Sequence, residues 1–518
     1  MGEFSSQFEG VTLFEAFVGA ARKYEDGHPV IEDAVGGSAT YKRLLIGARI
    51  LAEKFSKFTR KGEVVAVLLP NANAVAATFI ALQSSGRVPA MLNYTAGPAT
   101  ILSACTTVKA KTVIASRTFV EKAELQRVVE TLEGAELAIV WLEDIAKTIG
   151  AFDKAKGFLF RYRALEKTNA GDMALILFTS GSEGLPKGVV LSHANILANC
   201  AQVETRIDFS PADKLFNVLP VFHSFGLTGG MVLPLVFGVR LYLYPSPLHY
   251  KIIPQAVAKA KPTILFGTDT FLAGYARSAK DSDFASLRMV VAGAEAVREE
   301  TRRTWRERFD TLVLEGFGMT EAAPVVAVNT PDENRPGTVG KPLPGMEIRL
   351  ESVDGIEGGG RMYVRGPNVM MGYMRAENPG VLEPIGDGWH DSGDIVEIDA
   401  DGYVAIRGRV KRFAKVAGEM VSLGAIEMMV SGLWPEDHHA VVSVPDKRKG
   451  ERVVLVTTTD KANREMLSEE TRKMGLTELM VPNRIVTVPE VPILGSGKTD
   501  YQTARKLAIE QLGLDDAA

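Results

Sequence analysis

The sequence predicts an α/β protein with a large N-terminal domain, made of two doubly wound subdomains and a β-rich subdomain, and a small α+β C-terminal domain. Three observations support this prediction. Short apolar segments alternate with amphipathic helical segments as far as about residue 314, short strands and turns follow after about Pro344, and a smaller mixed unit begins near Lys411. A chain of 518 residues is long enough for several domains with their own cores.

The alternation of strands and helices has the rhythm of parallel sheets covered by helices on both faces. Before residue 175, strands are expected at 63–69, 112–115 and 137–141, with a helix at 72–85. After it, the expected strands are 215–219, 239–244, 263–266, 289–292 and 312–314. The later parts add expected strands at 347–350, 361–365 and 403–407 and expected helices at 424–433 and 464–474.

One span has the composition of a membrane helix. Residues 215–239 contain no Lys, Arg, Asp or Glu. They do contain Asn217, Pro220, Pro234 and several glycines, which would interrupt a spanning helix. We therefore expect a buried strand, a loop and a core helix here.

The overall composition is that of an ordinary globular enzyme, with 46% hydrophobic and 24% charged residues. The net charge of -4 gives no general attraction to nucleic acid or to an anionic membrane. Cys105 and Cys200 are too few for a disulfide framework and fit a reducing compartment. The N-terminal MGEFSSQFEG lacks the basic-then-apolar signal pattern, so a cytoplasmic location is expected.

The segment FTSGSEGLPKGVV, residues 178–190, has the composition of a phosphate-binding loop. An apolar run at 173–177 precedes it, and a helix is expected to begin after Ser192, which together suggest strand, loop and helix. The loop is not a Walker A motif, because Lys187 is preceded by Pro186 and followed by Gly188. The expected donors to phosphate are Thr179, Ser180, Ser182 and Lys187. Taken alone, the same letters also fit a Gly/Pro surface turn.

Motifs further along the chain also point to a nucleotide. In EGFGMTE, residues 315–321, Phe317 could stack on a base, Thr320 could hold a phosphate and Glu321 could ligate Mg²⁺. A carboxylate suited to ribose hydroxyls follows at Asp394, then a guanidinium at Arg409 and a lysine on a glycine turn at Lys498. Each has an ordinary alternative, such as a helix-start acid or a solvated charge, but together and in this order they favour a nucleotide site.

With these motifs the sequence resembles the adenylate-forming superfamily of acyl-CoA synthetases, adenylation domains and luciferases. The resemblance covers almost the whole chain and rests on FTSGSEGLPKGV, PVFHSFGLTGG, EGFGMTEAAP, RMYVRGPNVMMGYM, GWHDSGDI, IRGRVKRFAKVAGEMVSL and PILGSGKTDY. Within it, TSGSEG, GTDTFL and VAGAEAV are most similar to the acyl-[acyl carrier protein] synthetase part of a bacterial bifunctional enzyme that reacylates 2-acylglycerophosphoethanolamine. No acyltransferase domain is evident in this chain.

The resemblance implies an adenylation domain at 1–410 that binds acyl group and ATP, and a mobile C-terminal domain at 411–518. It implies ATP and Mg²⁺ as cofactors, with Glu321 as metal ligand, and catalytic roles for Lys498, Glu321, Thr320 and His223. Lys411 would be the hinge, and Gly418 would line a tunnel for the phosphopantetheine arm. The implied ATP-binding residues are Thr179, Ser180, Gly181, Ser182, Gly184, Lys187, Glu315, Gly316, Phe317, Gly318, Thr320, Asp394 and Arg409.

The sequence departs from the family in its loop, because Glu183 stands where most members have threonine. An acid beside phosphates repels them unless it points away or faces a cation, so Glu183 is given no phosphate contact. The candidate acyl pocket is apolar or small, with Asp269 as its one charge, which favours a fatty acid over an amino acid. Its expected lining residues are Phe225, Gly229, Gly230, Gly267, Ala292 and Gly293.

The expected reaction is activation of a medium- to long-chain fatty acid through acyl-AMP and transfer to the thiol of acyl carrier protein. Such carriers are acidic, and Lys411, Arg412, Lys415, Arg452 and residues 446–449 could form a basic face for one, or could simply be solvated. A long-chain fatty acid–CoA ligase is the nearest alternative; a luciferase-like oxygenase and a silent nucleotide-binding scaffold are weaker ones. Nucleic acid is not an expected partner, and association with an acyltransferase domain or the inner face of the bacterial inner membrane stays open.

Overall fold

The computed structural model describes residues 4–35, 37–180, 185–353, 356, 358–416, 419–446, 450–474, 477–493 and 499–514. The chain divides into two compact units. The first comprises Met1–Asn334, Pro342–Glu347 and Arg365–His390, and the second comprises Arg335–Lys341, Ile348–Val364 and Asp391–Ala518. The domain boundary predicted at residue 411 falls within the second unit, in the 3₁₀ turn η3 (Val410–Arg412), and stays a prediction.

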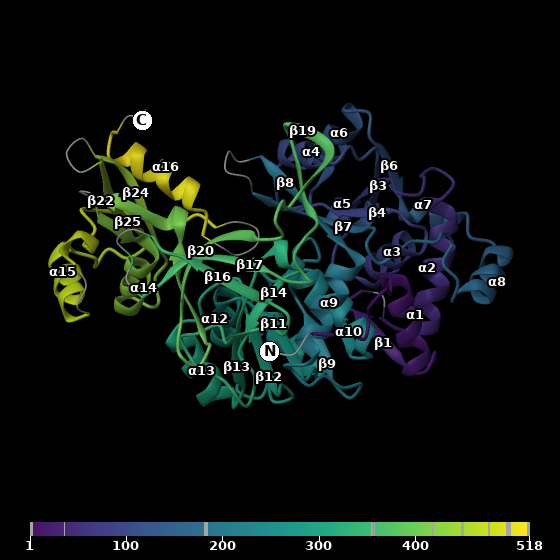
Figure 1. Ribbon diagram of the computed structural model, residues 1–518, viewed down its shortest axis with the longest axis horizontal. Helices are drawn as coiled ribbons and strands as arrows, with labels where there is room; N and C mark the ends of the chain where they lie inside the picture. The colour runs from purple at the N-terminus through teal and green to yellow at the C-terminus, as the bar shows by residue number, and fades with distance from the viewer. Residues whose placement is uncertain are drawn as a thin grey trace. The chain divides into compact units, whose positions relative to one another are not determined.

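The candidate phosphate loop connects two strands, β7 and β8, of one sheet of the first unit (Figure 1). The parallel strands of this sheet come from residues 64–180. Its parallel part is β7-β4-β3-β5-β6, and β8, β18 and β19 continue it in antiparallel fashion. The strands are β3 (Val64–Leu68), β4 (Val88–Met91), β5 (Thr112–Ala115), β6 (Ala138–Trp141), β7 (Met173–Ser180), β8 (Pro186–Ser192), β18 (Gly372–Arg375) and β19 (Asn378–Pro384).

A second sheet of the same unit carries the candidate acyl pocket. Its order is β15-β14-β13-β12-β11-β9-β10-β1-β2, and the strands from β13 to β1 are parallel to their neighbours. The strands are β1 (Pro29–Asp33), β2 (Gly37–Thr40), β9 (Lys214–Asn217), β10 (Arg240–Leu243), β11 (Ile264–Gly267), β12 (Met289–Ala292), β13 (Leu312–Gly318), β14 (Val325–Val328) and β15 (Lys341–Pro342).

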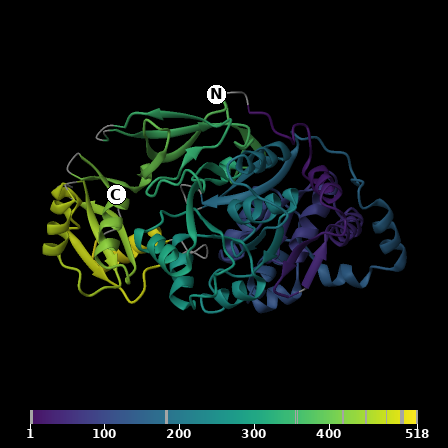
Figure 2. The same ribbon diagram turned by 90° about the horizontal axis from the view of Figure 1, so that it is seen from below.

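Helices cover these sheets, as both views show (Figures 1 and 2). The apolar helix α4 and the amphipathic helix α6 close one apolar core over the first sheet, around Leu68, Val113 and Ile176. The helices of the first unit are α1 (Leu13–Lys23), α2 (Tyr41–Phe55), α3 (Asn73–Ser84), α4 (Pro98–Thr107), α5 (Arg117–Lys122), α6 (Gln126–Gly134), α7 (Leu142–Lys147), α8 (Ala151–Phe160), α9 (His193–Glu204), α10 (Leu233–Phe237), α11 (Ile253–Ala260), α12 (Asp269–Ser278) and α13 (Glu299–Phe309), with the π-helix η1 (Phe225–Val232) and the 3₁₀ turn η2 (Thr320–Ala322).

The second unit contains a β-rich part and a smaller α+β part. The first has the sheet β16 (Glu347–Glu351), β17 (Gly360–Arg365), β20 (His390–Ile398) and β21 (Val404–Arg409). The second has the order β23-β22-β25-β24, with β26 parallel to β25. Its elements are β22 (Phe413–Val416), β23 (Glu419–Ser422), α14 (Leu423–Leu433), β24 (His439–Asp446), β25 (Gly450–Thr457), α15 (Arg464–Lys473), η4 (Glu478–Met480), β26 (Arg484–Thr487) and α16 (Tyr501–Gln511).

The predicted α/β architecture is confirmed, with one correction at the phosphate loop. The strand expected at 173–177 is extended as β7, but the loop leads into a second strand, β8, and not directly into a helix. Ser192 then caps α9, its Oγ accepting a hydrogen bond of 3.1 Å from Asn195 N. The loop therefore joins two antiparallel strands, and the dipole of α9 does not act on it directly.

The uncharged span at 215–239 forms the strand β9, a short connection and the helices η1 and α10, as expected. The core helix begins as a π-helix, a rare form that is frequent at functional sites. No helix in the part of the chain that is described is long and apolar enough to cross a membrane.

The N-terminal helix α1 is tied to α9 through a buried histidine. Leu13 N donates a 3.2 Å hydrogen bond to Nδ1 of His193, which is 2% exposed. Burial lowers the pKa of His193 to about 4, so the imidazole is neutral and accepts this bond near neutral pH. Protonation would leave a buried charge facing a donor.

This histidine predicts a loss of stability in acid. The folded-state pKa lies below the ordinary value of 6.5, so the unfolded chain takes up a proton first and stability falls as the pH drops from about 6.5 towards 4. The contribution amounts to about 3 kcal/mol across that window. His193→Asn keeps a neutral acceptor for Leu13, and urea midpoints for the first unit should then depend less on pH. Equal pH dependence of variant and parent would contradict the assignment.

Candidate active site

The base of the candidate phosphate loop is a registered pair of residues across the β7–β8 hairpin. Thr179 lies opposite Lys187, and Ser180 lies opposite Pro186. The Thr179 hydroxyl oxygen is buried and has no hydrogen-bond partner among the described residues. A buried hydroxyl is rarely left without a partner, so this atom suits an oxygen-rich ligand held at the loop.

Lys187 is linked to the predicted metal ligand through a tyrosine. The Lys187 ammonium lies 4.6 Å from the ring centroid of Tyr373, which is on β18, the antiparallel neighbour of β8. The Tyr373 hydroxyl donates a 2.8 Å hydrogen bond to Oε1 of Glu321. The backbone of Glu321 is also fixed, because its carbonyl accepts 2.8 Å from Met370 N. A cation and an anion from distant parts of the sequence therefore meet on one aromatic side chain.

The turn after β13 carries Thr320 and Glu321 in η2, between the antiparallel strands β13 and β14. A Cβ on Gly318 would lie 2.7 Å from the Pro324 carbonyl oxygen, so only glycine fits in this tight hairpin. Phe317 and Gly316 are half-buried on the same strand end. Gly318 is thus explained by packing alone, and the turn presents a hydroxyl and a carboxylate side by side.

Glu315, a predicted nucleotide residue, has its carboxylate occupied inside the protein. It is 7% exposed, forms an ion pair with Arg302, and accepts a 3.2 Å hydrogen bond from Val297 N. Its carbonyl accepts a further bond of 2.9 Å from Asn329 N. The side chain therefore fixes the segment between β12 and α13.

Two more predicted residues are brought together in the second unit. Asp394 and Arg409 stand opposite each other in the register of β20 and β21. Arg409 Nε lies 3.0 Å from Asp394 Oδ1, and the Asp394 side chain is 3% exposed whereas that of Arg409 is 62% exposed. Sequence reasoning proposed the two separately for ribose or phosphate, and the structure makes them an ion pair.

The predicted acyl-pocket residues gather around the ring of Phe225. This residue begins the π-helix η1, and its ring stacks on Phe266 at 5.1 Å between centroids. A Cβ on Gly229 would lie 3.3 Å from both rings, and one on Gly293 would lie 3.3 Å from Phe225. Gly267 and Ala292 are register partners on β11 and β12. Gly230 differs from the other predicted lining residues, because a Cβ there would lie 2.3 Å from Asn217.

His223 and Asp269 have neighbours that limit their roles. The His223 ring is half-buried and lies 4.8 Å from the ring of Phe222. Asp269 is buried, and its carboxylate accepts bonds of 3.0 Å and 2.6 Å from N and Nε of Arg298. The single charge expected in the acyl pocket is therefore neutralised by a guanidinium and is a poor partner for a substrate ammonium.

Several predicted residues lie outside the described residues. These are Gly181, Ser182 and Gly184 of the loop, the pantetheine-tunnel residue Gly418 and the catalytic Lys498. Only the backbone of Ser180 is described. The predicted hinge residue Lys411 is described and exposed, in η3.

Comparisons with known proteins can be set beside this geometry. Residues 17–374 match the AMP-binding enzyme family, and residues 435–498 match its C-terminal domain. The chain belongs to the AMP-binding enzyme family. A long-chain-fatty-acid–CoA ligase of Salmonella typhimurium is 28% identical over 523 residues, covering 94% of this chain and 93% of that protein. A feruloyl-CoA synthase of an Amycolatopsis species is 31% identical over 340 residues, covering 63% and 68%.

Solved structures of adenylate-forming enzymes have the same fold. An anthranilate CoA ligase, AuaEII, in complex with anthranoyl-AMP aligns with a TM-score of 0.83 at 20% identity, covering 98% of both chains. ATP-bound MatB from Rhodopseudomonas palustris aligns with a TM-score of 0.82 at 24% identity, covering 96% of this chain and 99% of that one. The large N-terminal and small C-terminal parts of this AMP-binding enzyme are thus shared with these proteins.

The donors around Glu321 fit a magnesium ion bound together with nucleotide. Mg²⁺ commonly takes one or two carboxylates and completes its shell with phosphate oxygens and water. Glu321 offers one half-buried carboxylate, and the Thr179 hydroxyl, which has no partner among the described residues, offers a further polar group in the unit. Within the described residues there is no cluster of three acidic, His or Cys side chains. The set therefore suits Mg²⁺ that arrives with phosphate better than a metal held by protein alone.

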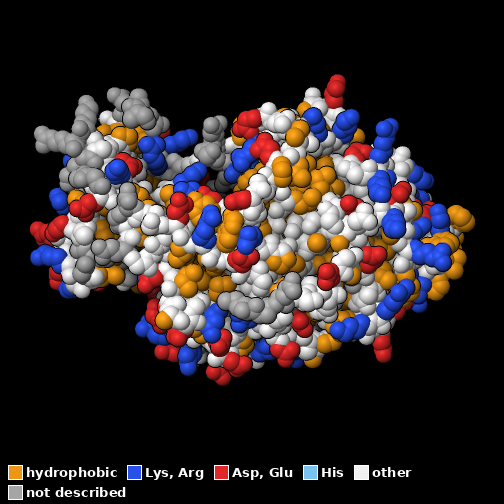
Figure 3. Space-filling model, in the orientation of Figure 1, with side chains coloured by type: hydrophobic (Ala, Val, Ile, Leu, Met, Phe, Trp, Pro, Cys, Tyr) orange, Lys and Arg blue, Asp and Glu red, His pale blue; other side chains and the backbone are white. Residues whose placement is uncertain are grey.

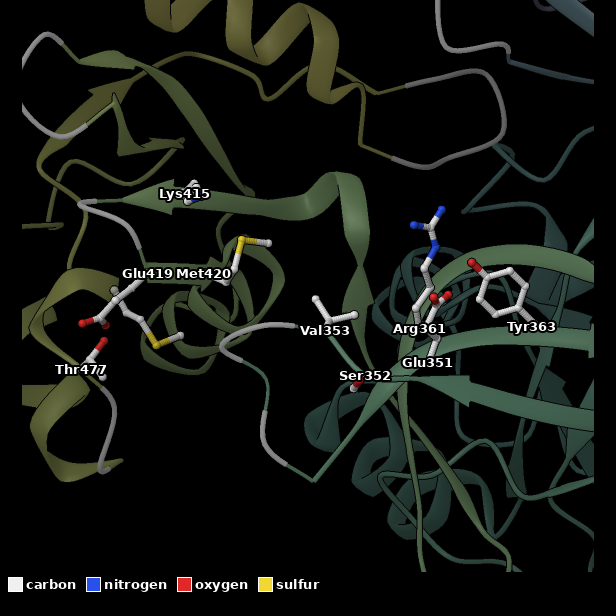
Figure 4. Close-up of a pocket in the computed structure, with 10 residues that line it drawn as sticks. Glu351, Ser352, Val353, Arg361, Tyr363, Lys415, Glu419, Met420 and Thr477 are labelled. Atoms are coloured by element: carbon white, nitrogen blue, oxygen red, sulfur yellow. The ribbon is translucent and has the colours of Figure 1, made fainter.

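A large pocket lies elsewhere, within the second unit (Figure 4). Its volume is about 880 Å³, and Arg361 and Tyr363 line one side while Lys415, Glu419 and Met420 line the other. It contains none of the predicted nucleotide or acyl residues. Size alone therefore does not identify the site of this AMP-binding enzyme.

Sequence reasoning missed Tyr373 and Arg302. Tyr373 stands in the motif RMYVRGPNVMMGYM, but no chemistry was assigned to it, since a tyrosine in a short strand is ordinary core material. Only the pairing of β18 with β8 reveals that its ring reaches Lys187. Arg302 lies in the charged helix α13, where nothing in the sequence distinguishes it from its solvated neighbours.

Tyr373→Phe tests whether the tyrosine positions Glu321. The variant keeps the ring beside Lys187 but loses the hydrogen bond to the carboxylate, an interaction with a charged group that is usually strong. We expect kcat/KM for ATP to fall by about 10- to 100-fold, with a higher Mg²⁺ requirement. AMP or pyrophosphate release over a Mg²⁺ titration measures this.

Tyr363→Phe, a ring in the pocket of the second unit, is the matched control. An unchanged Mg²⁺ titration in Tyr373→Phe would contradict the positioning role.

Proposed function

We propose that this AMP-binding enzyme activates a medium- to long-chain fatty acid with ATP through an acyl-AMP intermediate and transfers the acyl group to the thiol of coenzyme A. The observation that carries the proposal is the convergence of Lys187 and Glu321 on Tyr373, beside the base of the glycine-rich loop. It provides a cation for phosphate oxygens and an anion for a phosphate-bound metal ion at adjacent positions.

The proposed first step forms a mixed anhydride between the carboxylic acid and the α-phosphate. A carboxylate oxygen of the fatty acid attacks the α-phosphorus of ATP, the bond to the bridging oxygen breaks, and pyrophosphate leaves with its electron pair. Lys187 and the loop would hold the β- and γ-phosphates, and Lys498 would contact the carboxylate and the α-phosphate. Bound Mg²⁺ would neutralise phosphate charge at Glu321. Positioning and charge stabilisation dominate such a reaction.

In the second step the thiolate sulfur attacks the acyl carbonyl carbon, a thioester bond forms and AMP leaves. Since Lys498 would occupy the position that the thiol needs, we propose that the C-terminal part rotates about Lys411 between the steps. Gly418 would leave room for the pantetheine arm.

A fatty acid is the proposed substrate because the pocket candidates are apolar. Phe225, Phe266 and the two glycines at 229 and 293 form a carbon-lined cluster. Asp269 is already paired with Arg298, so the carboxylate near this cluster is not available to bind the amino group of an amino-acid substrate. The full-length relatives from Salmonella typhimurium and Yersinia pestis, both long-chain-fatty-acid–CoA ligases, support the same substrate class.

Acyl carrier protein, the acceptor favoured by the sequence, is the second candidate. Its support is the exposure of Lys411 and Lys415. Two other members of the expected basic face are engaged within the unit: Arg412 pairs with Glu427 at 2.9 Å, and Arg452 lies 3.6 Å from Asp446. Residues 447–449 lie outside the described part. Because the curated relatives above are CoA ligases, coenzyme A is the acceptor we favour.

An acceptor comparison tests the proposal. The protein receives ATP, Mg²⁺ and palmitate with either coenzyme A or holo acyl carrier protein, and AMP and thioester are measured separately. We expect AMP and thioester with coenzyme A. Thioester formed on the carrier protein alone would show that acyl carrier protein, and not coenzyme A, is the acceptor. Absence of AMP with every acceptor would contradict the adenylation step itself.

Phe225 should set the acyl length. Its ring fills the space against Gly229 and Gly293, so Phe225→Ala opens room for further methylenes. One methylene in an apolar pocket is worth about 10- to 200-fold in discrimination, and we expect kcat/KM for palmitate relative to octanoate to rise by about tenfold or more. Gly229→Ala, which crowds Phe225 and Phe266 at 3.3 Å, should shift the ratio the other way. An unchanged ratio in both variants would show that the acyl chain lies elsewhere.

A further inference from the structure

Helix α8 lies at the edge of the first unit (Figure 1), and apolar side chains on one of its faces are exposed. Phe152 is 79% exposed, Leu159 is 70% exposed and Phe158 is 44% exposed. With 100° between successive residues, these three side chains and Ala155 share an arc of about 120°. Hydrophobic side chains accordingly gather over α8 in the space-filling view, beside Lys and Arg (Figure 3).

The opposite face fixes this orientation. Gly157 is buried against α2, where a Cβ would lie 2.8 Å from Ile50 Cγ1 and 3.2 Å from the Ile46 carbonyl oxygen. Lys54 of α2 pairs with Asp153 at 2.9 Å and also donates to the Thr148 carbonyl at 3.0 Å. One side of α8 is therefore fixed against α2, and Phe152, Phe158 and Leu159 on its other side face solvent.

Positive charge surrounds the apolar face. Residues 147–167 contain six Lys or Arg and two Asp or Glu. Three of the cations are paired with acids outside this segment, Lys147 with Asp144, Lys156 with Glu53 and Arg161 with Asp26, which leaves Lys154, Arg163 and Lys167 as exposed positive charges. Lys154 and Arg163 are exposed, and Arg161 and Lys42 lie 4.7 Å and 5.1 Å from the ring centroid of Phe158. The net charge of the whole chain, from which no attraction to anionic membranes was expected, does not reveal these local positive charges.

We propose that α8 docks this protein on the surface of an anionic phospholipid bilayer. Phe152, Phe158 and Leu159 would enter the headgroup boundary, and the flanking lysines and arginines would contact lipid phosphates, as in interfacial amphipathic helices. A second copy of the chain fits less well. Three large side chains supply roughly 300–400 Å², below the roughly 800 Å² per partner of a stable interface, and the like charges around them would face each other.

Vesicle sedimentation tests the proposal without ATP or acyl substrate, so its outcome is independent of the proposed reaction. The full chain is mixed with vesicles of phosphatidylcholine alone or with about one third phosphatidylglycerol. We expect binding to the anionic vesicles that weakens as salt rises, because exposed charges are screened. Phe152→Ser/Leu159→Ser should lower the partition coefficient by about tenfold, and Lys154→Glu/Arg163→Glu should lower it on the anionic vesicles only.

The matched control is Leu248→Ser/Ile252→Ser. These residues are also exposed, at 44% and 54%, in the same unit, but they lie outside α8. The control should bind vesicles like the parent. The proposal would be overturned if the parent did not bind anionic vesicles, or if Phe152→Ser/Leu159→Ser bound them as well as the parent. It would also be overturned if size-exclusion chromatography showed that the α8 substitutions convert a dimer to a monomer.

Discussion

The antiparallel strand β8 is the constraint on which the rest of the candidate site depends. It pairs with β7 on one side and with β18 on the other, and so joins the glycine-rich loop to a segment about 190 residues further along the chain. Its second residue is Lys187, its neighbour β18 carries Tyr373, and its last residue, Ser192, caps α9. Shifting β8 by one residue against its neighbours would turn the side chains of β8, Lys187 among them, to the opposite face of the sheet.

Much of the fold could be predicted from the sequence because its strands are short apolar runs separated by amphipathic helices. The strands at 112–115 and 289–292 coincide with β5 and β12, and the uncharged span resolved as expected into β9 and a core helix. The strand that follows the glycine-rich loop was not predictable. Pro186–Ser192 is apolar and short, and whether such a run joins a strand or a helix is decided by its partner β18, which lies far away in the sequence.

The candidate site was predictable in its residue types and less so in its connections. The motifs predict roles for Lys187, Glu321, Asp394 and Arg409, and these stay predictions. The partners of these residues come from tertiary packing, as with Tyr373 and the register of β20 and β21. The sequence also does not show whether a glycine is required by packing or by a substrate site. Gly318 is required by a carbonyl oxygen of its own hairpin, whereas Gly229 and Gly293 leave room for an aromatic ring that borders a candidate substrate site.

The ion pair between Asp394 and Arg409 also bears on how the C-terminal part could turn. Arg409 is the last residue of β21 and is held to β20, while Arg412, three residues later, is bound by Glu427 and lies 3.6 Å from the ring centroid of Tyr501. One arginine is thus anchored to the β-rich sheet and the other to the C-terminal fold. Between the two anchors stand only Val410 and Lys411. The rotation proposed at Lys411 would therefore have to occur almost entirely in the φ and ψ angles of these two residues, which would restrict it to a narrow range of directions.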